Sequence, residues 1–161
     1  MNTAYLLMGG NMGNTRRIFC RVTEDLRKQN IFVKRHSSLY KTAAWGMENQ
    51  PDFLNTVIEA ETDLSARELL AVILQTETKN GRIRQEKYGP RIIDIDILFF
   101  NNDIIQEPNL IVPHPLLQER NFALRPLAEL IPDFIHPVFN KSIQQLSETS
   151  KDELNAEKLD E

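Results

Sequence analysis

The apolar positions of the chain change their spacing several times, and each change predicts a strand or a helix. An apolar run over 4–8 ends in a glycine pair, which indicates a buried strand. Apolar residues then recur at helical spacing from 15 to about 29, behind Asn14, which can cap such a helix. The segments 31–40 and 53–60 are both predicted as strands.

The middle of the chain continues this mixture of elements. A capping box starts a second helix at Ser65, and its expected buried stripe reaches Leu74. The strictest alternation of the chain follows at 93–97, where isoleucines and aspartates take turns. The turn-forming residues 101–103 then predict a hairpin, with a return strand at 104–105.

The last third completes an α+β pattern. After a proline-rich stretch at 108–115, Asn121 is expected to cap a helix that runs to about Leu130. The acidic residues 148–161 predict a frayed helix or disordered tail behind a domain of 1–147. The order β-α-β-β-α-β, followed by a hairpin and helices, indicates one ferredoxin-like domain with helices packed on a mostly antiparallel sheet.

Composition and charge narrow the classes of function. A chain of 161 residues with 41% hydrophobic and 26% charged residues is typical of a soluble globular domain. Its net charge of −4 argues against a general nucleic-acid binder. The first residues lack the charges and the apolar length of an export signal or membrane span, and the single Cys20 fits a reducing compartment. We therefore expect a cytoplasmic monomer that binds neither nucleic acid nor membrane.

The most informative chemistry lies in residues 81–100, GRIRQEKYGPRIIDIDILFF. The carboxylates of Asp94 and Asp96 would share one face of a strand, roughly 6.5–7 Å apart. One interpretation is an ordinary acidic outer face. The other is a Mg²⁺ site beside a polyphosphate, because strands disfavour aspartate, like charges repel, and an arginine-rich loop precedes the pair. The pattern by itself leaves both interpretations open.

Two further features could belong to a site. The turn at 9–14, GGNMGN, could offer N–H groups to an anion, although it is neither a Walker A loop nor GxGxxG, and a plain tight turn is the alternative. His114 lies between two prolines and could be functional or structural. The sequence has no Ser-His-Asp order, nucleophilic cysteine setting or zinc spacing, which favours phosphoryl-type transfer.

Residues 87–98, KYGPRIIDIDIL, resemble the signature of the 6-hydroxymethyl-7,8-dihydropterin pyrophosphokinase family of folate biosynthesis. Other motifs of that family match in order along the chain: GGNMGN at 9–14, SSLYKT at 37–42, QPDFLN at 50–55, GRIR at 81–84, VPHP at 112–115 and RNFAL at 120–124. The resemblance implies transfer of the pyrophosphoryl group of ATP to the hydroxymethyl oxygen of the pterin, leaving AMP.

The resemblance also implies roles for individual residues. Asp94 and Asp96 would hold two Mg²⁺ ions, while Arg82 and Arg91 would grip the phosphates as catalytic residues. Further residues expected to contact ATP are Arg84, Lys87, Tyr88, Ile97, His114 and Arg120. Residues expected to line the pterin pocket are Gly9, Thr42, Ala43, Trp45, Phe53, Asn55, Tyr88 and Phe122. Glu77 matches an acid of the family on the second helix.

The chain departs from the family pattern at several pocket positions. Ala43-Ala44-Trp45 replaces a loop that usually contains proline, and Phe53 replaces a tyrosine. No departure removes a carboxylate, a phosphate-gripping arginine or Asn55, so we expect an active enzyme. Two alternatives are another Mg²⁺-dependent phosphoryl or nucleotidyl transferase, which would ignore pterins, and a non-catalytic nucleotide-binding regulatory domain, which would not release AMP.

Overall fold

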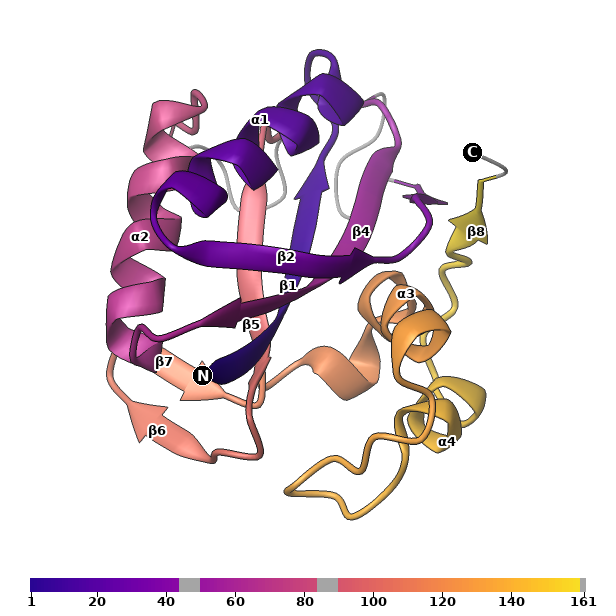
Figure 1. Cartoon of the computed structure of the whole chain (residues 1–161). Coiled ribbons are helices and arrows are strands. Elements are labelled where there is room, and N and C mark those ends of the chain that lie inside the picture. The colour runs from indigo at the N-terminus through magenta and orange to yellow at the C-terminus, as the bar shows by residue number, and fades with distance from the viewer. Residues whose placement is uncertain (44–49, 84–89, 160–161) are drawn as a thin grey trace.

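The computed structural model describes residues 1–43, 50–83 and 90–159, and its centre is an antiparallel sheet (Figure 1). The strands of this sheet are β1 (Asn2–Gly10), β2 (Ile31–His36), β3 (Tyr40–Thr42), β4 (Phe53–Thr62), β5 (Asp94–Phe100) and β8 (Glu157–Lys158). Their order is β5-β1-β4-β3-β8, and β2 also pairs with β4. Every one of these pairings is antiparallel.

The helices cover the two faces of the sheet as separate pairs. They are α1 (Thr15–Lys28), α2 (Ala66–Lys79), α3 (Asn121–Leu130) and α4 (Ile143–Glu148), with a short 3₁₀ turn η1 (Leu117–Glu119). One core lies under α1 and α2, and the other lies under α3 and α4 (Figure 1). No helix within the described ranges is long and apolar enough to cross a membrane.

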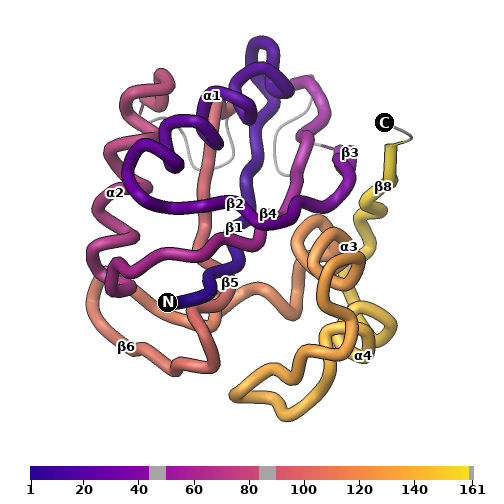
Figure 2. The backbone as a smooth tube through the Cα atoms, in the orientation of Figure 1, coloured from indigo at the N-terminus to yellow at the C-terminus, as the bar shows by residue number. Residues whose placement is uncertain are grey.

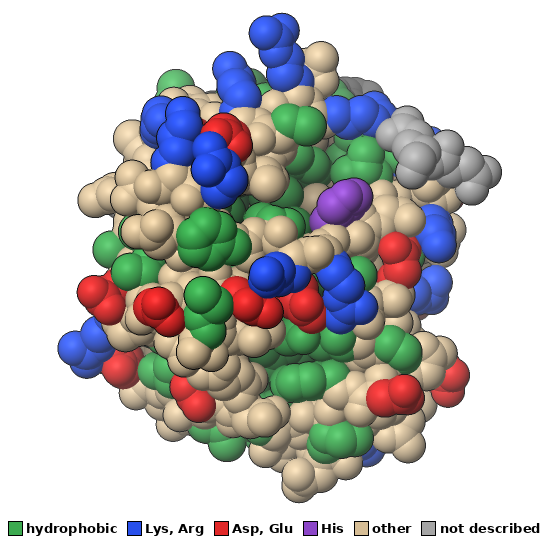
Figure 3. Space-filling view, viewed as in Figure 1, with side chains coloured by type: hydrophobic (Ala, Val, Ile, Leu, Met, Phe, Trp, Pro, Cys, Tyr) green, Lys and Arg blue, Asp and Glu red, His purple; other side chains and the backbone are tan. Residues whose placement is uncertain are grey.

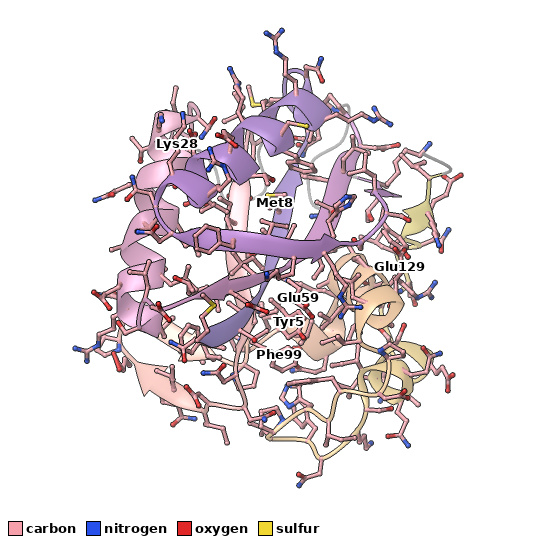
Figure 4. The ribbon with its side chains drawn as sticks, in the orientation of Figure 1. Tyr5, Met8, Lys28, Glu59, Phe99 and Glu129 are labelled. Atoms are coloured by element: carbon pink, nitrogen blue, oxygen red, sulfur yellow. The ribbon has the colours of Figure 1, made fainter. Side chains whose placement is uncertain are left out.

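The central strand β1 supplies side chains to both cores, which explains its unbroken apolar sequence. Leu6 and Met8 point into the core under α1 and α2, whereas Tyr5 and Leu7 point into the other. Figure 4 shows Tyr5 beside Glu59 and Phe99, and the Tyr5 hydroxyl donates a hydrogen bond to Glu59 at 2.9 Å. A strand buried on both faces fixes the two layers of helices relative to each other.

The predicted fold class is confirmed, and so are two of the three predicted helix starts. The elements β1-α1-β2-β4-α2-β5 place β5 beside β1 and β4 between β1 and β2, the ferredoxin-like arrangement. The Asn14 side chain accepts a hydrogen bond from the Arg17 N–H, as a helix cap does. Ser65 and Glu68 form both hydrogen bonds of a capping box at the start of α2.

Two predictions about regular elements are wrong in detail. The expected strand over 31–40 is divided, because the Ser37 hydroxyl accepts the Val57 N–H and turns the chain between β2 and β3. On α2 the side chain of Leu74 is 53% exposed, while Thr76 and Glu77 are buried. The apolar spacing therefore placed the end of the buried stripe on the wrong residues.

The predicted return strand at 104–105 does not pair with β5. Instead β6 (Ile105–Glu107) pairs with β7 (Leu110–Val112) in a separate two-stranded sheet. The hairpin turn is Pro108-Asn109, where neither residue has a positive φ, and type I turns favour proline in the first central position. Asn101, with φ of 51°, hydrogen-bonds to Thr3 and directs the chain away from β5.

The acidic segment 148–161, expected as a frayed helix or disordered tail, is folded onto the sheet over its described residues. α4 ends at Glu148, Ala156 is buried, and β8 extends the sheet beyond β3. Asn121 also differs from expectation, because it is the first residue of α3 rather than its cap. Its side chain donates hydrogen bonds to the segment 152–154, a contact that local spacing cannot reveal.

Candidate functional site

Three neighbouring strands place Asn55, Gly9 and Asp94 side by side. Gly9 on β1 lies opposite Asn55 on β4 and opposite Asp94 on β5. Residues directly opposite each other point to the same face of a sheet, here the face that carries α3 further along. Two strand spacings separate the Cα atoms of Asn55 and Asp94 by about 10 Å. This row joins the expected pterin residues to the expected metal ligands.

Gly9 allows the Asn55 side chain to lie across β1. A Cβ atom on Gly9 would be 2.4 Å from Asn55 Nδ2, far inside contact distance. Asn55 is buried, and among the described residues Nδ2 makes only a long hydrogen bond of 3.4 Å to the Met8 carbonyl oxygen. Its amide therefore retains hydrogen-bonding capacity that a ligand could use.

Asn11 connects the segment before β5 to the segment before β4. The sequence motifs did not single it out. Its Oδ1 accepts the Arg91 N–H at 2.8 Å, and its backbone N–H donates to the Arg91 carbonyl at 2.8 Å. Its Nδ2 donates to Gln50 Oε1 and to the Pro51 carbonyl, both at 2.9 Å. The sequence carried no local signal for this role, because the fold determines both the burial of Asn11 and its partners, which lie 39 to 80 residues away.

The carboxylates of Asp94 and Asp96 lie on the polar face of β5, as the alternation predicted. Arg82 Nη1 is 3.0 Å from Asp94 Oδ1, and Arg91 Nε is 2.9 Å from Asp94 Oδ2. Burial raises the pKa of Asp94, and the two guanidinium groups oppose that effect. Within the described part of the chain, Asp96 forms no ion pair. The two aspartates thus differ sharply in their surroundings.

Glu77 on α2 lies behind Asp94 and is itself buried. Its Oε2 accepts the Ile95 N–H at 2.7 Å and pairs with Arg82 Nη1 at 2.8 Å. Burial raises the pKa of Glu77 to about 7, and the neighbouring Asp94 charge adds to the effect. Glu77 therefore orients Arg82 and anchors the first residues of β5.

His114 lies beside β5, next to Asp96. Its backbone N–H donates to the Leu98 carbonyl at 3.0 Å, and its Nδ1 accepts the Leu116 N–H at 3.1 Å. Burial lowers the pKa of His114, Asp96 raises it, and Arg120 lowers it further. The neutral ring consequently carries its proton on Nε2, which can donate to a ligand.

A cleft of about 290 Å³ opens beside Arg82 and Arg91. Its lining residues are Met12, Gly81, Arg82, Ile83, Pro90, Arg91 and Ile92. The two arginines that pair with Asp94 thus also face the cleft. Lysine and arginine side chains gather over α1, which begins three residues after Met12 (Figure 3). A phosphate in this cleft would meet a positive environment.

On the other side of the row, β3 and α3 carry the remaining expected pterin residues. Thr42 lies opposite Phe53, is buried, and its hydroxyl has no hydrogen-bond partner among the described residues. Phe122 is half-buried on α3, and the Arg120 guanidinium lies 5.5 Å from its ring centre. A buried unpaired hydroxyl and a partly exposed ring suit a flat polar heterocycle.

Some expected site residues are not brought together. The side chain of Ile97 lies in the core under α1 and α2, on the opposite face from the aspartates, because alternate residues of a strand point to opposite faces. Ala43 is exposed at the end of β3. The expected residues Trp45, Arg84, Lys87 and Tyr88 lie outside the described residues.

A carboxylate pair with two arginines at one end of a ferredoxin-like sheet has the parts of a phosphoryl-transfer site. The chain belongs to the 7,8-dihydro-6-hydroxymethylpterin-pyrophosphokinase family, whose pattern matches residues 5–132. The family suggested by the sequence motifs is thereby confirmed.

Individual relatives agree with this assignment. The chain is 40% identical over 145 residues to a 2-amino-4-hydroxy-6-hydroxymethyldihydropteridine pyrophosphokinase of Aquifex aeolicus, covering 90% of each chain. It is 43% identical over 131 residues to the enzyme of the same name from Bacillus subtilis, covering 80% of this chain and 78% of that one.

A solved structure agrees on the fold. The HPPK-DHPS of Plasmodium falciparum with SDX-DHP matches with a TM-score of 0.71 at 19% identity. The match covers 92% of this chain and 43% of the length of that chain. Identity at this level supports the fold alone, while the bacterial relatives carry the family assignment.

Proposed function

We propose that this chain transfers the pyrophosphoryl group of ATP to the hydroxyl of 6-hydroxymethyl-7,8-dihydropterin, giving the pterin diphosphate and AMP, in folate biosynthesis. The family match over residues 5–132 carries this proposal. The cluster of Arg82, Arg91 and Asp94 supports it, because a polyphosphate needs this kind of charge neutralisation.

We also propose that the chain is a cytoplasmic monomer that binds neither nucleic acid nor membrane. The net charge of −4 supports the absence of nucleic-acid binding, because proteins that bind nucleic acid without sequence preference are usually basic.

The residues at the start of β5 fit a magnesium ion shared with the nucleotide. Mg²⁺ prefers hard oxygen ligands and typically takes one or two carboxylates together with phosphate oxygens and water. The described residues contain no cluster of three metal-ligating side chains. Asp94 and Asp96 would hold two such ions, whose charge would offset that of the phosphates.

Arg82 and Arg91 would change partners when ATP binds. Both guanidinium groups contact Asp94, so a metal ion would compete with them for its carboxylate oxygens. The phosphates offer the arginines a more highly charged partner, and bidentate contacts to phosphate suit the guanidinium group. Glu77 keeps Arg82 within reach throughout this exchange, because their 2.8 Å pair does not involve Asp94.

The pterin would lie on the row next to the carboxylates. Asn55 and Thr42 offer polar groups to the edge of the heterocycle, and Phe122 offers a ring for stacking. The distance of about 10 Å between Asn55 and Asp94 leaves room for the hydroxymethyl group to face the β-phosphorus in line. The arginines would stabilise the negative charge that spreads over the phosphate oxygens during transfer.

A single assay separates this function from the two alternatives. The protein is incubated with ATP, Mg²⁺ and 6-hydroxymethyl-7,8-dihydropterin, and nucleotide products are separated by chromatography. We expect AMP in amounts equal to the pterin diphosphate, and none with a pterin that lacks the hydroxymethyl group. ADP would indicate another transferase, and ATP binding without AMP would indicate a regulatory domain. Either result would overturn the proposal.

A further inference from the structure

The segment 150–159, here called the strap, closes one edge of the sheet. Its residues Glu157 and Lys158 pair with Lys41 and Tyr40 of β3. The Leu159 N–H then donates to the Leu39 carbonyl at 2.9 Å. Figure 2 shows this segment running from α4 past α3 to the edge of β3. The strap lies beyond the residues 5–132 that the family pattern matches.

The strap also binds the first residue of α3. Asp152 Oδ2 accepts the Asn121 N–H at 2.9 Å, and Asp152 Oδ1 accepts the Leu154 N–H at 3.0 Å. The Asn121 side chain donates to the carbonyl oxygens of Asp152 and Leu154 at 3.1 and 2.9 Å. Arg120, which precedes the helix, makes no side-chain cap. A carboxylate 31 residues away therefore does the work of a helix cap.

The far end of α3 is tied to the same edge. Glu129, near the end of α3 in Figure 4, accepts hydrogen bonds from the Tyr40 hydroxyl and the Ser38 N–H, both at 2.8 Å. Lys158 of the strap lies 3.5 Å from the same carboxylate. The strap, α3 and β3 thus form a closed arrangement in which each element contacts the other two.

Two expected pterin residues directly follow residues that the strap holds. Phe122 comes after Asn121, and Thr42 comes after Lys41. We propose that the strap positions these two pocket walls and so determines affinity for the pterin, with Asp152 as its main positioning residue. This inference rests on the proposed function, because it assumes that Phe122 and Thr42 contact the pterin.

The strand order restricts the effect to one substrate. β8 and β5 lie at opposite ends of the order β5-β1-β4-β3-β8, so three strands separate the strap from Asp94 and Asp96. No hydrogen bond or ion pair links the strap to Arg82 or Asp94 within the described residues. Loosening the strap should therefore weaken pterin binding much more than ATP binding, which it could affect only through Arg120, the residue before Asn121.

The test compares Asp152→Ala with Glu153→Ala, which removes an exposed acid from the next position. We expect the Kd and KM for the pterin to rise about tenfold in Asp152→Ala, with KM for ATP changed less than about twofold. Glu153→Ala should match the wild type. Asp152→Asn keeps an oxygen that can accept the Asn121 N–H and should recover most of the loss.

Pterin binding is measured directly by calorimetry, and hydrogen exchange at residues 121–123 reports on the start of α3. If Asp152→Ala does not fold, Asp152→Asn must still show a smaller rise in the pterin Kd and faster exchange there. An unchanged pterin Kd, or equal losses for ATP and pterin, would overturn the inference. Wild-type protein that binds pterin without forming AMP would refute the proposed function, while the Kd comparison would still decide the role of the strap.

Discussion

The two halves of the proposed site are held in place by different forces. On the phosphate side, Glu77, Arg82 and Asp94 are held by ion pairs and by a hydrogen bond to the Ile95 N–H. On the pterin side, β3 and the first turn of α3 are held by backbone pairing and by hydrogen bonds from the strap. The phosphate half is therefore held by charges that can exchange partners, whereas the pterin half is a preformed pocket.

This difference fits the substrates that each half would receive. A polyphosphate with its metal ions brings enough charge to replace the existing ion pairs. The pairing of the arginines with Asp94 therefore need not block the reaction. A neutral heterocycle binds mainly through buried surface area and a few hydrogen bonds. It binds most tightly to a pocket whose residues are already at the right distance. Variants in the two halves should therefore fail in different ways.

The largest effect is expected from Asp96→Asn on the phosphate side. The variant keeps the shape of the side chain but loses a charge proposed to hold the metal, so kcat should fall about 10³-fold. Because Asp96 makes no ion pair within the described chain, its free energy of unfolding should change by less than about 0.5 kcal/mol. Steady-state AMP formation and urea unfolding measure the two quantities.

Asp103→Asn is the matched control, since Asp103 is an exposed aspartate just beyond the same strand. It should leave both quantities unchanged. Near-normal turnover in Asp96→Asn, or a loss of activity that follows a loss of stability, would contradict the assignment of Asp96 as a metal ligand.

A pair of neighbouring glycines separates the two halves with the same change. In Gly9→Ala the new methyl group meets Asn55 Nδ2 at 2.4 Å, so the amide must rotate away and KM for the pterin should rise about 10²-fold. In Gly10→Ala the methyl group meets the Ile92 carbonyl oxygen at 2.6 Å. That backbone must shift, which should cost about 1–3 kcal/mol of stability and raise KM for ATP.

Each glycine variant serves as the control for the other, because both add one methyl group to the end of β1. KM for both substrates and the free energy of unfolding are measured in parallel. If both variants raised the same KM, the division of the site at β1 would be wrong.

The phosphate half was largely predictable from the sequence, because its residues lie close together in the chain. The alternation at 93–97 predicted a strand with two carboxylates on one face, and the arginines stood beside it. The pairing of Arg82 and Arg91 with Asp94 could not be read in this way. Side-chain partners depend on three-dimensional distances, which the spacing of a single strand does not contain.

The pterin half was predictable only through the family resemblance, and its frame was misjudged. Asn121 was interpreted as a helix cap and 148–161 as a tail, yet the two segments bind each other through Asp152. A helix cap supplied from 31 residues away leaves no periodic signal. The strap does have low hydrophobicity, but backbone pairing with β3 and partly buried hydrogen bonds hold it to the sheet.

A smaller effect, on stability rather than turnover, is expected from the buried acid of the phosphate half. Burial raises the pKa of Glu77 from 4.5 to about 7, so the folded state keeps a proton that the unfolded state releases. Stability from this group is therefore present below about pH 4.5 and is lost as the pH rises through 7. Relative to Glu77→Gln, the wild type should lose about 3 kcal/mol between pH 4.5 and 8.

Urea unfolding of both proteins at four pH values across this window measures that loss. Glu68→Gln is the control, because Glu68 is exposed and its pKa is lowered by hydrogen bonds to Ser65. A constant difference between wild type and Glu77→Gln at all pH values would contradict the raised pKa.

The smallest effect is a salt dependence that should separate the two halves without any mutation. Raising the ionic strength from about 0.1 to 0.5 M shortens the screening length from about 10 Å to about 4 Å. The exposed arginines of α1 and the cleft arginines would then attract ATP less, so KM for ATP should rise about two- to fivefold. KM for the uncharged pterin should stay constant, because stacking and short hydrogen bonds are barely screened. Steady-state kinetics with each substrate varied in turn measures both, and an equal rise in the two KM values would show that charge attraction does not distinguish the halves.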